Sequence, residues 1–424
     1  MMRILDYKGI EDRDIIASPQ PIRDVSEPVR EIIERVRVDG DRALYDYALR
    51  FDKVELKSLR VTAQEMEEAL AVVEDEFVKI LEKSAQNIRE FHAKQLRSGF
   101  EIRRGEGVVL GQRITPIERV GLYVPGGTAA YPSTVLMDAI PAKIAGCPKV
   151  VMVTPPGIGG KVNPVILAAA KVAGVDEIYK VGGAQAIAAL AYGTETIPKV
   201  DKIVGPGNAF VAEAKKQVFG LVSIDMIAGP SEILVVADGE NDPRYIAADL
   251  LSQAEHDRNA SAVLITDSPS FAEQVQLSIE ELLEQMERKD IARSSVDNNG
   301  KIIVVEDLSQ GIDVANEIAP EHLELCVKDP FALLDRVKHA GSVFLGRNCP
   351  EAIGDYYAGM NHTLPTCGTA RFSSPLSVDD FIKKTQYAYY SAEALAEVAD
   401  EVAAFARKEG LIGHARSATI RSKK

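Results

Sequence analysis

The chain is poor in the residues that mark disulfide-rich, metal-thiolate and membrane proteins. Its 424 residues contain only four cysteines, and no two of them have the C-x-x-C spacing. The sequence therefore predicts neither a disulfide framework nor a zinc site built on thiolates. No apolar stretch approaches the roughly 20 residues that span a bilayer, and the first residues are too acidic for a signal peptide. We expect a cytoplasmic protein with reduced thiols and no membrane partner.

Basic residues are also too few for one class of partner. Lysine and arginine total 49 against 63 aspartates and glutamates, which gives a formal net charge of −14. A nucleic-acid-binding surface needs clustered Lys and Arg, so no nucleic-acid partner is expected. The same balance still allows a local basic pocket for a dinucleotide. A chain of this length is expected to divide into two or more domains.

Two series of short β-rich segments alternate with helical patterns in the middle of the chain, and both ends read as helix. This alternation predicts parallel sheets with crossover helices. We therefore expect an α/β fold with two related doubly wound, incomplete Rossmann-like domains with parallel sheets, plus small helical N- and C-terminal segments. The expected strands lie within residues 150–157, 177–183 and 201–207, and then within 232–238, 262–267, 301–307, 322–327 and 342–346.

Glycine-rich turns follow the expected strands at the carboxyl ends, where open α/β sheets bind ligands. In VGGAQA (residues 181–186) and VGPGNAF (residues 204–210), small residues let backbone N–H groups approach a phosphate. Neither turn matches G-x-G-x-x-G, and no acidic residue lies at the usual offset for a ribose. Tight-turn geometry alone explains each of them equally well. A third turn, LYVPGG (residues 122–127), presents Tyr123, and an isolated tyrosine is more often a packing residue.

Polar residues that could bind a metal or transfer protons occur mostly in the second half of the chain. Gln253 and His256 are three positions apart in DLLSQAEHD (residues 249–257), so a helix would place them on one face. Alone this pair is a weak metal signal. Glu321 and His322 follow a proline at the start of an expected strand, where an acid and an imidazole can transfer protons.

Two further clusters are less informative by themselves. Asp355 and His362 lie in GDYYAGMNHTLPT (residues 354–366), which reads as a loop, and loops on rigid sheets often carry functional groups. Glu409 and His414 fall just after the C-terminal helical pattern and have no evident role without context. The occurrence of all these polar clusters in one chain indicates an enzyme.

In their order along the chain, these motifs resemble the histidinol dehydrogenase family nearly end to end. The most specific segment runs from IDMIAGPSEILVV to SQAEH, residues 224–256. The other matching segments are LYVPGG, VGGAQA, VGPGN, APEHLEL, GDYYAGMNH and EGLIGH.

The resemblance implies a zinc-dependent, NAD-linked oxidation of L-histidinol to L-histidine through L-histidinal, in two successive hydride transfers that end histidine biosynthesis. It implies one zinc ion per subunit and a homodimer with shared active sites. The implied zinc ligands are Gln253, His256, Asp355 and His414. These four ligands also contact the substrate, together with Ser231, His322, His362 and Glu409. The implied NAD contacts are Tyr123, Gln185 and Asn208.

The chemistry of the two steps assigns roles to the adjacent pair. Removing a hydroxyl proton while hydride leaves carbon suits an imidazole with a pKa near neutrality, and we expect His322 to do this. The aldehyde must be hydrated before the second hydride leaves, and we expect Glu321 to activate that water. The rival mechanism forms a thiohemiacetal on a cysteine thiolate. Against it, Cys147 and Cys326 read as buried apolar residues, and neither of the others, Cys349 and Cys367, has a neighbouring cue for activation.

The resemblance also implies the division into domains. We expect an N-terminal arm over residues 1–20 and a metal- and substrate-binding α/β domain over residues 21–108 and 231–378. An NAD-contacting α/β domain is expected over residues 109–230. The last segment, residues 379–424, is expected to be helical and exchanged between subunits.

Three alternatives remain open at this point. A paralogous metal- and NAD-dependent dehydrogenase could act on another small alcohol, although Glu409, His362 and His414 argue against it. A metal-dependent hydrolase would use similar residues but would not need the glycine-rich loops. A non-enzymatic binding protein leaves the convergent polar groups unexplained.

Overall fold

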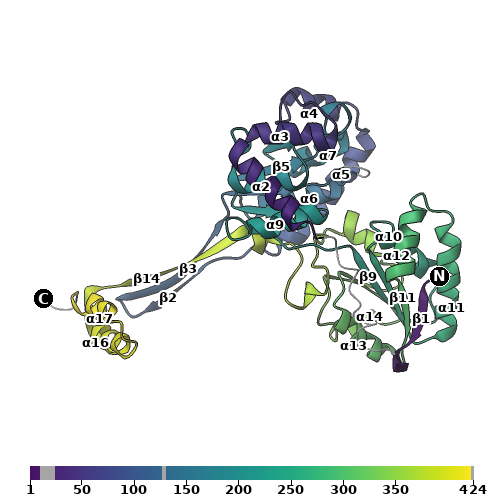
Figure 1. Ribbon diagram of the computed structural model, residues 1–424. Coiled ribbons are helices and arrows are strands. Elements are labelled where there is room, and N and C mark those ends of the chain that lie inside the picture. Colours follow the sequence, from purple (N-terminus) through teal and green to yellow (C-terminus); the bar gives the residue numbers. More distant parts are fainter. Residues whose placement is uncertain (10–23, 127–129, 422–424) are drawn as a thin grey trace. The chain divides into compact units, whose positions relative to one another are not determined.

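In the computed structural model, which describes residues 1–9, 24–126 and 130–421, the chain forms two compact units (Figure 1). The first unit comprises Met1–Gln95 and Glu118–Phe381, and the second comprises Leu96–Ile117 and Ile382–Lys424. Two parallel sheets belong to the first unit, and a three-stranded antiparallel sheet belongs to the second. Among the described helices, none is long and apolar enough to cross a membrane.

The larger parallel sheet has six strands in the order β1-β11-β10-β9-β12-β13. Its central strands are continuous apolar runs because parallel strands are covered on both faces; Ile233 to Ala237 are all buried. The bounds are β1 Arg3–Asp6, β9 Glu232–Ala237, β10 Ser261–Thr266, β11 Lys301–Val304, β12 His322–Cys326 and β13 Ser342–Leu345. The five strands expected from the sequence in this region are confirmed.

Helices cover both faces of this sheet, and each face has its own apolar cluster. The helix that carries Gln253 is α10, and its start is fixed by Pro243 at the first position and by Asp242, whose side chain accepts the Arg244 N–H. One face carries α10 (Pro243–Ala254), α11 (Pro269–Leu283) and α12 (Lys289–Asn299), and the other carries α13 (Leu308–Ile318) and α14 (Pro330–Leu334).

The second parallel sheet has the strand order β6-β5-β4-β7-β8. The chain starts at β4, adds β5 and β6 on one side, and then crosses back to add β7 and β8 on the other side. The strand order therefore reverses between β4 and β7, and such a reversal is where doubly wound sheets bind ligands. The bounds are β4 Arg119–Tyr123, β5 Lys149–Thr154, β6 Glu177–Lys180, β7 Lys202–Val204 and β8 Ser223–Ile224.

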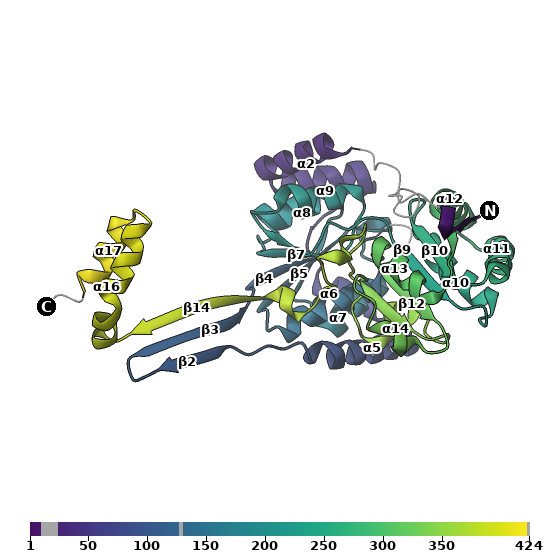
Figure 2. The same ribbon diagram turned by 90° about the horizontal axis from the view of Figure 1, so that it is seen from below.

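Helices on the two faces of the five-stranded sheet include most of the N-terminal region. Figure 2 shows α2, α8 and α9 on one side of the sheet and α6 and α7 on the other. In the core, α2 and α3 pack against α8, while α4 packs on α7 and α5 packs on α6 and α7. The bounds are α2 Ser26–Asp39, α3 Asp41–Tyr47, α4 Ala63–Leu70, α5 Asp75–Ala93, α6 Pro132–Ile144, α7 Pro164–Ala173, α8 Gly183–Tyr192 and α9 Ala209–Val218.

These contacts differ from the grouping expected from the sequence. Residues 21–108 were expected to join residues 231–378, but α2, α3 and α4 contact helices of the five-stranded sheet, and only α5 also contacts the helical turn Gly354–Ala358. Within the expected N-terminal arm, Arg3–Asp6 form the edge strand β1, which pairs in parallel with β11. Residues 10–20 of that arm lie outside the described residues.

The second unit holds a feature that the sequence analysis missed. Strand β14 (Ile382–Tyr390) pairs antiparallel with β3 (Val108–Pro116), which in turn pairs with β2 (Phe100–Arg104). The C-terminal segment is therefore not helical throughout, since it begins with a strand. Every residue of β14 after Ile382 is exposed, so no buried face produced a strand signal. Helices α16 (Ala392–Lys408) and α17 (Ile412–Thr419) follow, and alanines pack between them.

Candidate functional site

The candidate catalytic residues lie at the amino-terminal end of the six-stranded sheet. His322 is the first residue of β12 and Glu232 is the first residue of β9, and the two strands are neighbours. Gln253 reaches the same end of the sheet because α10 runs back across it and finishes there. The sequence placed Glu321 and His322 at the start of an expected strand, and β12 begins at His322.

His322 is held in one tautomer by the backbone. Its Nδ1 lies 2.9 Å from the carbonyl oxygen of Glu232. A carbonyl oxygen only accepts, so Nδ1 carries the proton and Nε2 of the neutral ring keeps a free lone pair. Nε2 is buried without a hydrogen-bond partner, 3.8 Å from Glu351 Oε1 and 3.9 Å from Asp355 Oδ1. Burial lowers the pKa of His322, so the ring is poised as a base.

Asp355 and His362 form an ion pair beside His322. Burial disfavours the ionised form of Asp355, but the interaction with His362 outweighs burial and lowers the pKa of Asp355 to about 2. Nδ1 of His362 lies 3.6 Å from Asp355 Oδ1, and its Nε2 lies 3.3 Å from Thr134 Oγ1. Burial opposes the charged imidazole, yet Asp355 raises the pKa of His362. The cluster thus contains one fixed carboxylate next to the free Nε2 of His322.

Glu351 is a member of this cluster that the sequence analysis missed. It opens the short helix α15 (Glu351–Ile353), which continues into the helical turn Gly354–Ala358, so the loop expected over residues 354–366 is helical at its start. Asp355 lies four positions after Glu351, and that spacing places both carboxyl groups on one face of a helix. The spacing was visible in the sequence, but the assignment of a loop concealed it.

Gln253 and His256 connect the end of α10 to this cluster. The side chain of Gln253 is buried and hydrogen-bonds Glu351, while the His256 N–H donates to the Gln253 carbonyl at 3.1 Å. Burial, together with the nearby Asp355, raises the pKa of Glu351 to about 8. Burial also lowers the pKa of His256, which keeps that ring neutral.

These residues fit a divalent cation such as zinc. Ligand atoms of His322, Glu351 and Asp355 all lie within 4.8 Å of one another. Two buried atoms of this group, His322 Nε2 and Glu351 Oε1, have no hydrogen-bond partner, which is costly unless another group satisfies them. Asp355 together with Gln253 and His256 gives a donor set of oxygen and imidazole nitrogen, which zinc accepts in sites that keep open positions, and this set leaves His322 Nε2 free for proton transfer.

Glu321 and Ser231 border the cluster at the start of β9. Glu321 Oε2 accepts the Glu232 N–H at 2.9 Å and lies 3.7 Å from His322 Nδ1. Burial raises the pKa of Glu321 well above its ordinary value. Raising the pKa of a carboxyl group makes its ionised form a stronger base. Ser231 lies in the same turn, and its carbonyl accepts the Ser261 N–H.

Two of the four cysteines, Cys326 and Cys367, lie where a thiolate is disfavoured. Cys147 and Cys326 are buried, as the sequence predicted, while Cys349 is half-buried and Cys367 is exposed. Burial and neighbouring carboxyl groups raise the pKa of the Cys326 and Cys367 thiols, which disfavours the thiolate.

The expected cofactor residues lie at carboxyl ends of the five-stranded sheet. Tyr123 ends β4, and its hydroxyl accepts the Gly183 N–H at 3.1 Å. Gln185 is buried in the first turn of α8. Asn208 caps α9, where its side-chain oxygen accepts the Phe210 N–H at 3.0 Å.

Close backbone contact explains one glycine of these loops. Gly205 has φ +115°, and a Cβ atom there would lie 2.1 Å from the carbonyl oxygen of Tyr123. A side chain is therefore excluded between the ends of β4 and β7. The loops after β4 and β7 flank the reversal of strand order, and the loop after β6 meets them through the Gly183–Tyr123 hydrogen bond, so their small residues fit a dinucleotide backbone.

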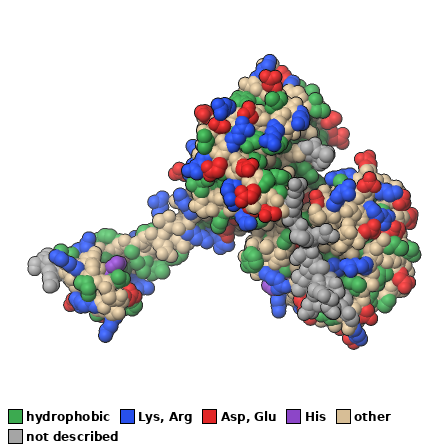
Figure 3. Space-filling model, viewed as in Figure 1, with side chains coloured by type: hydrophobic (Ala, Val, Ile, Leu, Met, Phe, Trp, Pro, Cys, Tyr) green, Lys and Arg blue, Asp and Glu red, His purple; other side chains and the backbone are tan. Residues whose placement is uncertain are grey.

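Glu409 and His414 belong to the second unit. Glu409 follows α16 and His414 lies in α17, and both line a hollow that also includes Phe405 and Leu411. Many apolar side chains are exposed in this unit, and hydrophobic surface is visible around its helices in Figure 3. The large ones are Leu96, Phe100, Ile102, Tyr387, Tyr389, Tyr390, Val402, Phe405, Leu411, Ile412 and Ile420.

Comparison with known proteins gives consistent matches over nearly the whole chain. The family model for histidinol dehydrogenase matches residues 17–422. The histidinol dehydrogenase of Clostridium acetobutylicum is 54% identical over 400 residues, which cover 94% of this chain and 93% of that protein. The enzyme of Bacillus cereus is 55% identical over 397 residues, with 94% and 92% covered. The crystal structure of histidinol dehydrogenase from Elizabethkingia anophelis has a TM-score of 0.94 at 40% identity, covering 99% of this chain and 98% of that one.

The sequence match and the structural match agree with each other and with the order of motifs along the chain. The two parallel sheets confirm the α/β class expected from the sequence. This chain belongs to the histidinol dehydrogenase family of oxidoreductases.

Proposed function

We propose that the protein oxidises L-histidinol to L-histidine through L-histidinal, with NAD as the oxidant and one zinc ion per subunit, as the last steps of histidine biosynthesis in the cytoplasm. The observation that carries this proposal is the state of His322. Its proton is fixed on Nδ1 by the Glu232 carbonyl, and its buried Nε2 faces the Asp355 cluster without a partner.

Gln253, His256 and Asp355 would hold the zinc ion, with His414 of the partner subunit as the fourth ligand. When bound, zinc would anchor and orient the substrate, and NAD would accept the hydride in each step. The ion pair with His362 keeps the Asp355 carboxylate ionised, as a zinc ligand must be. Tyr123, Gln185 and Asn208 would contact NAD.

The chain's own residues move the protons. In the first oxidation, Nε2 of His322 takes the hydroxyl proton as hydride leaves the carbon, which yields the aldehyde. In the second, Glu321 takes a proton from the water that adds to the aldehyde, and His322 takes the proton of the resulting diol as the second hydride leaves. Ser231, His362 and Glu409 would bind the substrate around these groups. The raised thiol pKa values of Cys326 and Cys367 support hydration over a thiohemiacetal.

A homodimer with shared sites forms part of the proposal. His414 and Glu409 are carried by a unit with its own fold and a large exposed apolar surface. Burying such a surface against a second copy is favourable, and exchange of a C-terminal segment is a known route to dimers.

The test is the yield of NADH from the metal-loaded protein with L-histidinol. Two NADH per substrate, lost with a chelator and restored by zinc, are expected. One NADH would refute the role of Glu321. If no NADH forms but the protein still binds NADH, the protein would instead be a paralogue that oxidises another alcohol.

A further inference from the structure

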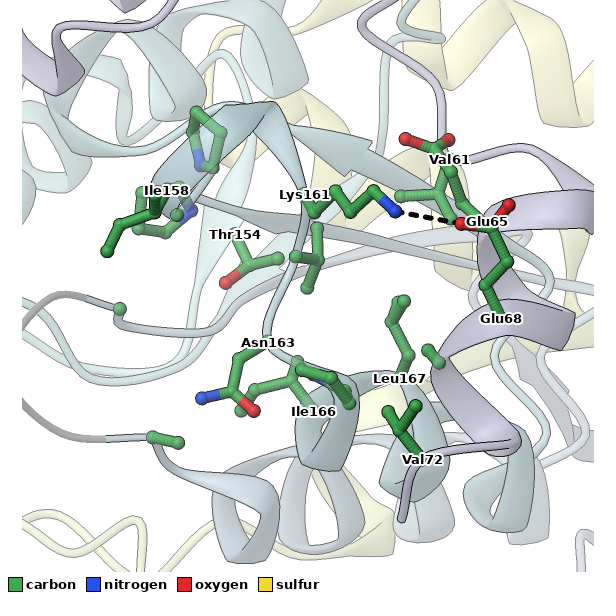
Figure 4. A pocket seen from close by; sticks show the side chains of 18 of the residues that line it. Val61, Glu65, Glu68, Val72, Thr154, Ile158, Lys161, Asn163, Ile166 and Leu167 are labelled. Carbon is green, nitrogen blue, oxygen red and sulfur yellow. Dashed lines mark hydrogen bonds and ion pairs between the residues drawn. The ribbon is translucent and has the colours of Figure 1, made fainter.

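Two features of the first unit involve residues that have no assigned role so far. One is a cavity of about 780 Å³ between α4 and α7, which Figure 4 shows from close by. It opens beside the loops that end β4 and β5 and therefore belongs with the cofactor loops. The other is a pair of acids next to the candidate zinc cluster, Asp249 of α10 and Glu324 of β12.

Glu324 is an acid in the middle of a buried strand. Strand β12 has the sequence HLELC, and all five of its residues are buried. Leu323 and Leu325 belong to the apolar cluster on the face that α13 covers. Alternate residues of a strand point to opposite faces, so Glu324 lies between His322 and Cys326 on the face that α10 covers. Burying a carboxyl group there costs free energy unless other groups satisfy it.

The carboxyl group of Glu324 caps the helical stretch that carries Glu351 and Asp355. Its Oε1 accepts the Glu351 N–H at 2.7 Å. Glu351 is the first residue of α15, and the preceding N-cap residue, Pro350, provides no side-chain hydrogen bond. The first N–H groups of a helix have no partner within the helix, so Glu324 supplies an acceptor that is otherwise missing. This hydrogen bond ties the start of α15 to β12.

Asp249 ties the same carboxyl group to α10. The side chains of Asp249 and Glu324 hydrogen-bond each other. Two carboxylates can only accept, so one of the two groups carries a proton. Burial, together with the neighbouring Asp249, raises the pKa of Glu324 well above its ordinary value, which places the proton on Glu324 and the charge on the half-buried Asp249. Asp249 precedes Gln253 by four positions, so the two side chains lie on one face of α10.

We propose that Glu324 and Asp249 are positioning residues, which hold the elements that carry Gln253, His322 and Asp355 in register around the zinc ion. Both acids act through other residues: Glu324 through the Glu351 N–H, and Asp249 through the backbone of α10. The inference rests on the proposed zinc dependence.

The test measures the dissociation constant for zinc by competition of the zinc-loaded protein with a chromophoric chelator, together with urea unfolding of each variant. Glu324→Gln should bind zinc as the wild type does, because the amide oxygen still accepts the Glu351 N–H and the amide nitrogen can donate to Asp249. Glu324→Met fills a similar volume but loses both hydrogen bonds, so its zinc affinity should fall about tenfold.

A double variant and a control separate positioning from general stability. Glu324→Met with Asp249→Leu should regain part of the stability that Glu324→Met loses, because no acid is left without its partner. Its zinc affinity should nevertheless stay about tenfold below that of the wild type. Asp242→Ala is the matched control, since this acid accepts the Arg244 N–H at the opposite end of α10 from Gln253. It should lower the urea midpoint and leave zinc affinity unchanged.

Three results would overturn the inference. They are wild-type zinc affinity in Glu324→Met, a loss in Glu324→Gln as large as that in Glu324→Met, and a double variant with wild-type zinc affinity. The double variant alone decides the matter if Glu324→Met does not fold.

NADH formation from L-histidinol is scored separately. A protein that forms two NADH but gives one of these three results would refute the positioning role and leave the proposed function standing. Zinc binding that responds to Glu324→Met, in a protein that forms no NADH, would refute the proposed function and leave the positioning role standing.

Discussion

A buried ion pair beneath the cofactor loops allows a quantitative test of the structure. Lys215 and Asp225 form this pair, and their side chains are only 3% and 1% exposed. Both residues also hold Gly205: Lys215 Nζ donates to its carbonyl at 3.1 Å, and Asp225 Oδ2 accepts its N–H at 2.8 Å. The pair therefore fixes the turn that precedes Asn208.

Replacing Lys215 with Met keeps the apolar stem but leaves a buried carboxylate without its partner. Breaking a buried pair in this way costs about 3–5 kcal/mol of unfolding free energy. Lys216→Met is the matched control, because Lys216 is 61% exposed and pairs with Glu213 on the helix surface. An exposed pair of that kind contributes at most about 1 kcal/mol.

The assay is urea unfolding followed by far-ultraviolet circular dichroism, since the chain contains no tryptophan. The double variant Lys215→Met with Asp225→Asn should recover much of the loss, because no buried charge remains. NADH binding by Lys215→Met should weaken, since the Gly205 carbonyl loses its hydrogen bond from Lys215. If Lys215→Met and Lys216→Met were equally stable, the ion pair would not hold this turn as described.

Three further predictions concern protonation, chemistry and assembly. Burial raises the pKa of Asp138 to about 7. Between about pH 4 and pH 7 the folded state therefore keeps a proton on Asp138 that the unfolded state has lost. The free energy of unfolding should fall by on the order of 3–4 kcal/mol as the pH rises through this range. Asp138→Asn should flatten this slope in urea titrations, and an unchanged slope would contradict the assignment. Glu321→Gln keeps an acceptor for the Glu232 N–H but should slow the second oxidation by roughly 10²–10⁴-fold. A timed assay should then yield one NADH per L-histidinol. Two NADH at the normal rate would exclude Glu321 as the base. Deleting residues 393–424 should abolish activity while circular dichroism shows a folded α/β body, and mixing with a Gln253→Ala, His256→Ala chain should restore activity only if sites are shared.

Much of the fold followed from local patterns. Continuous apolar runs such as Glu232–Ala237 and Ser261–Thr266 marked buried parallel strands, and all eight expected strands formed. Such strands can be predicted from the sequence because burial on both faces requires an unbroken run of apolar residues. Strand β14 was missed for the converse reason, since an exposed ribbon places no such demand on its sequence.

Some features of the candidate site could likewise be predicted from the sequence, and others could not. Its residue types and motif spacings, such as Gln253 with His256, were visible in the chain because neighbours on a helix follow from local geometry. Tertiary structure alone decided that the starts of β9 and β12 lie side by side at the cluster, that Glu351 joins it, and that the Glu232 carbonyl selects the tautomer of His322. These features depend on contacts between residues up to about a hundred positions apart. A one-dimensional pattern fixes which groups are present and how each element folds, whereas the protonation and partners of a buried group depend on what the packed chain brings beside it.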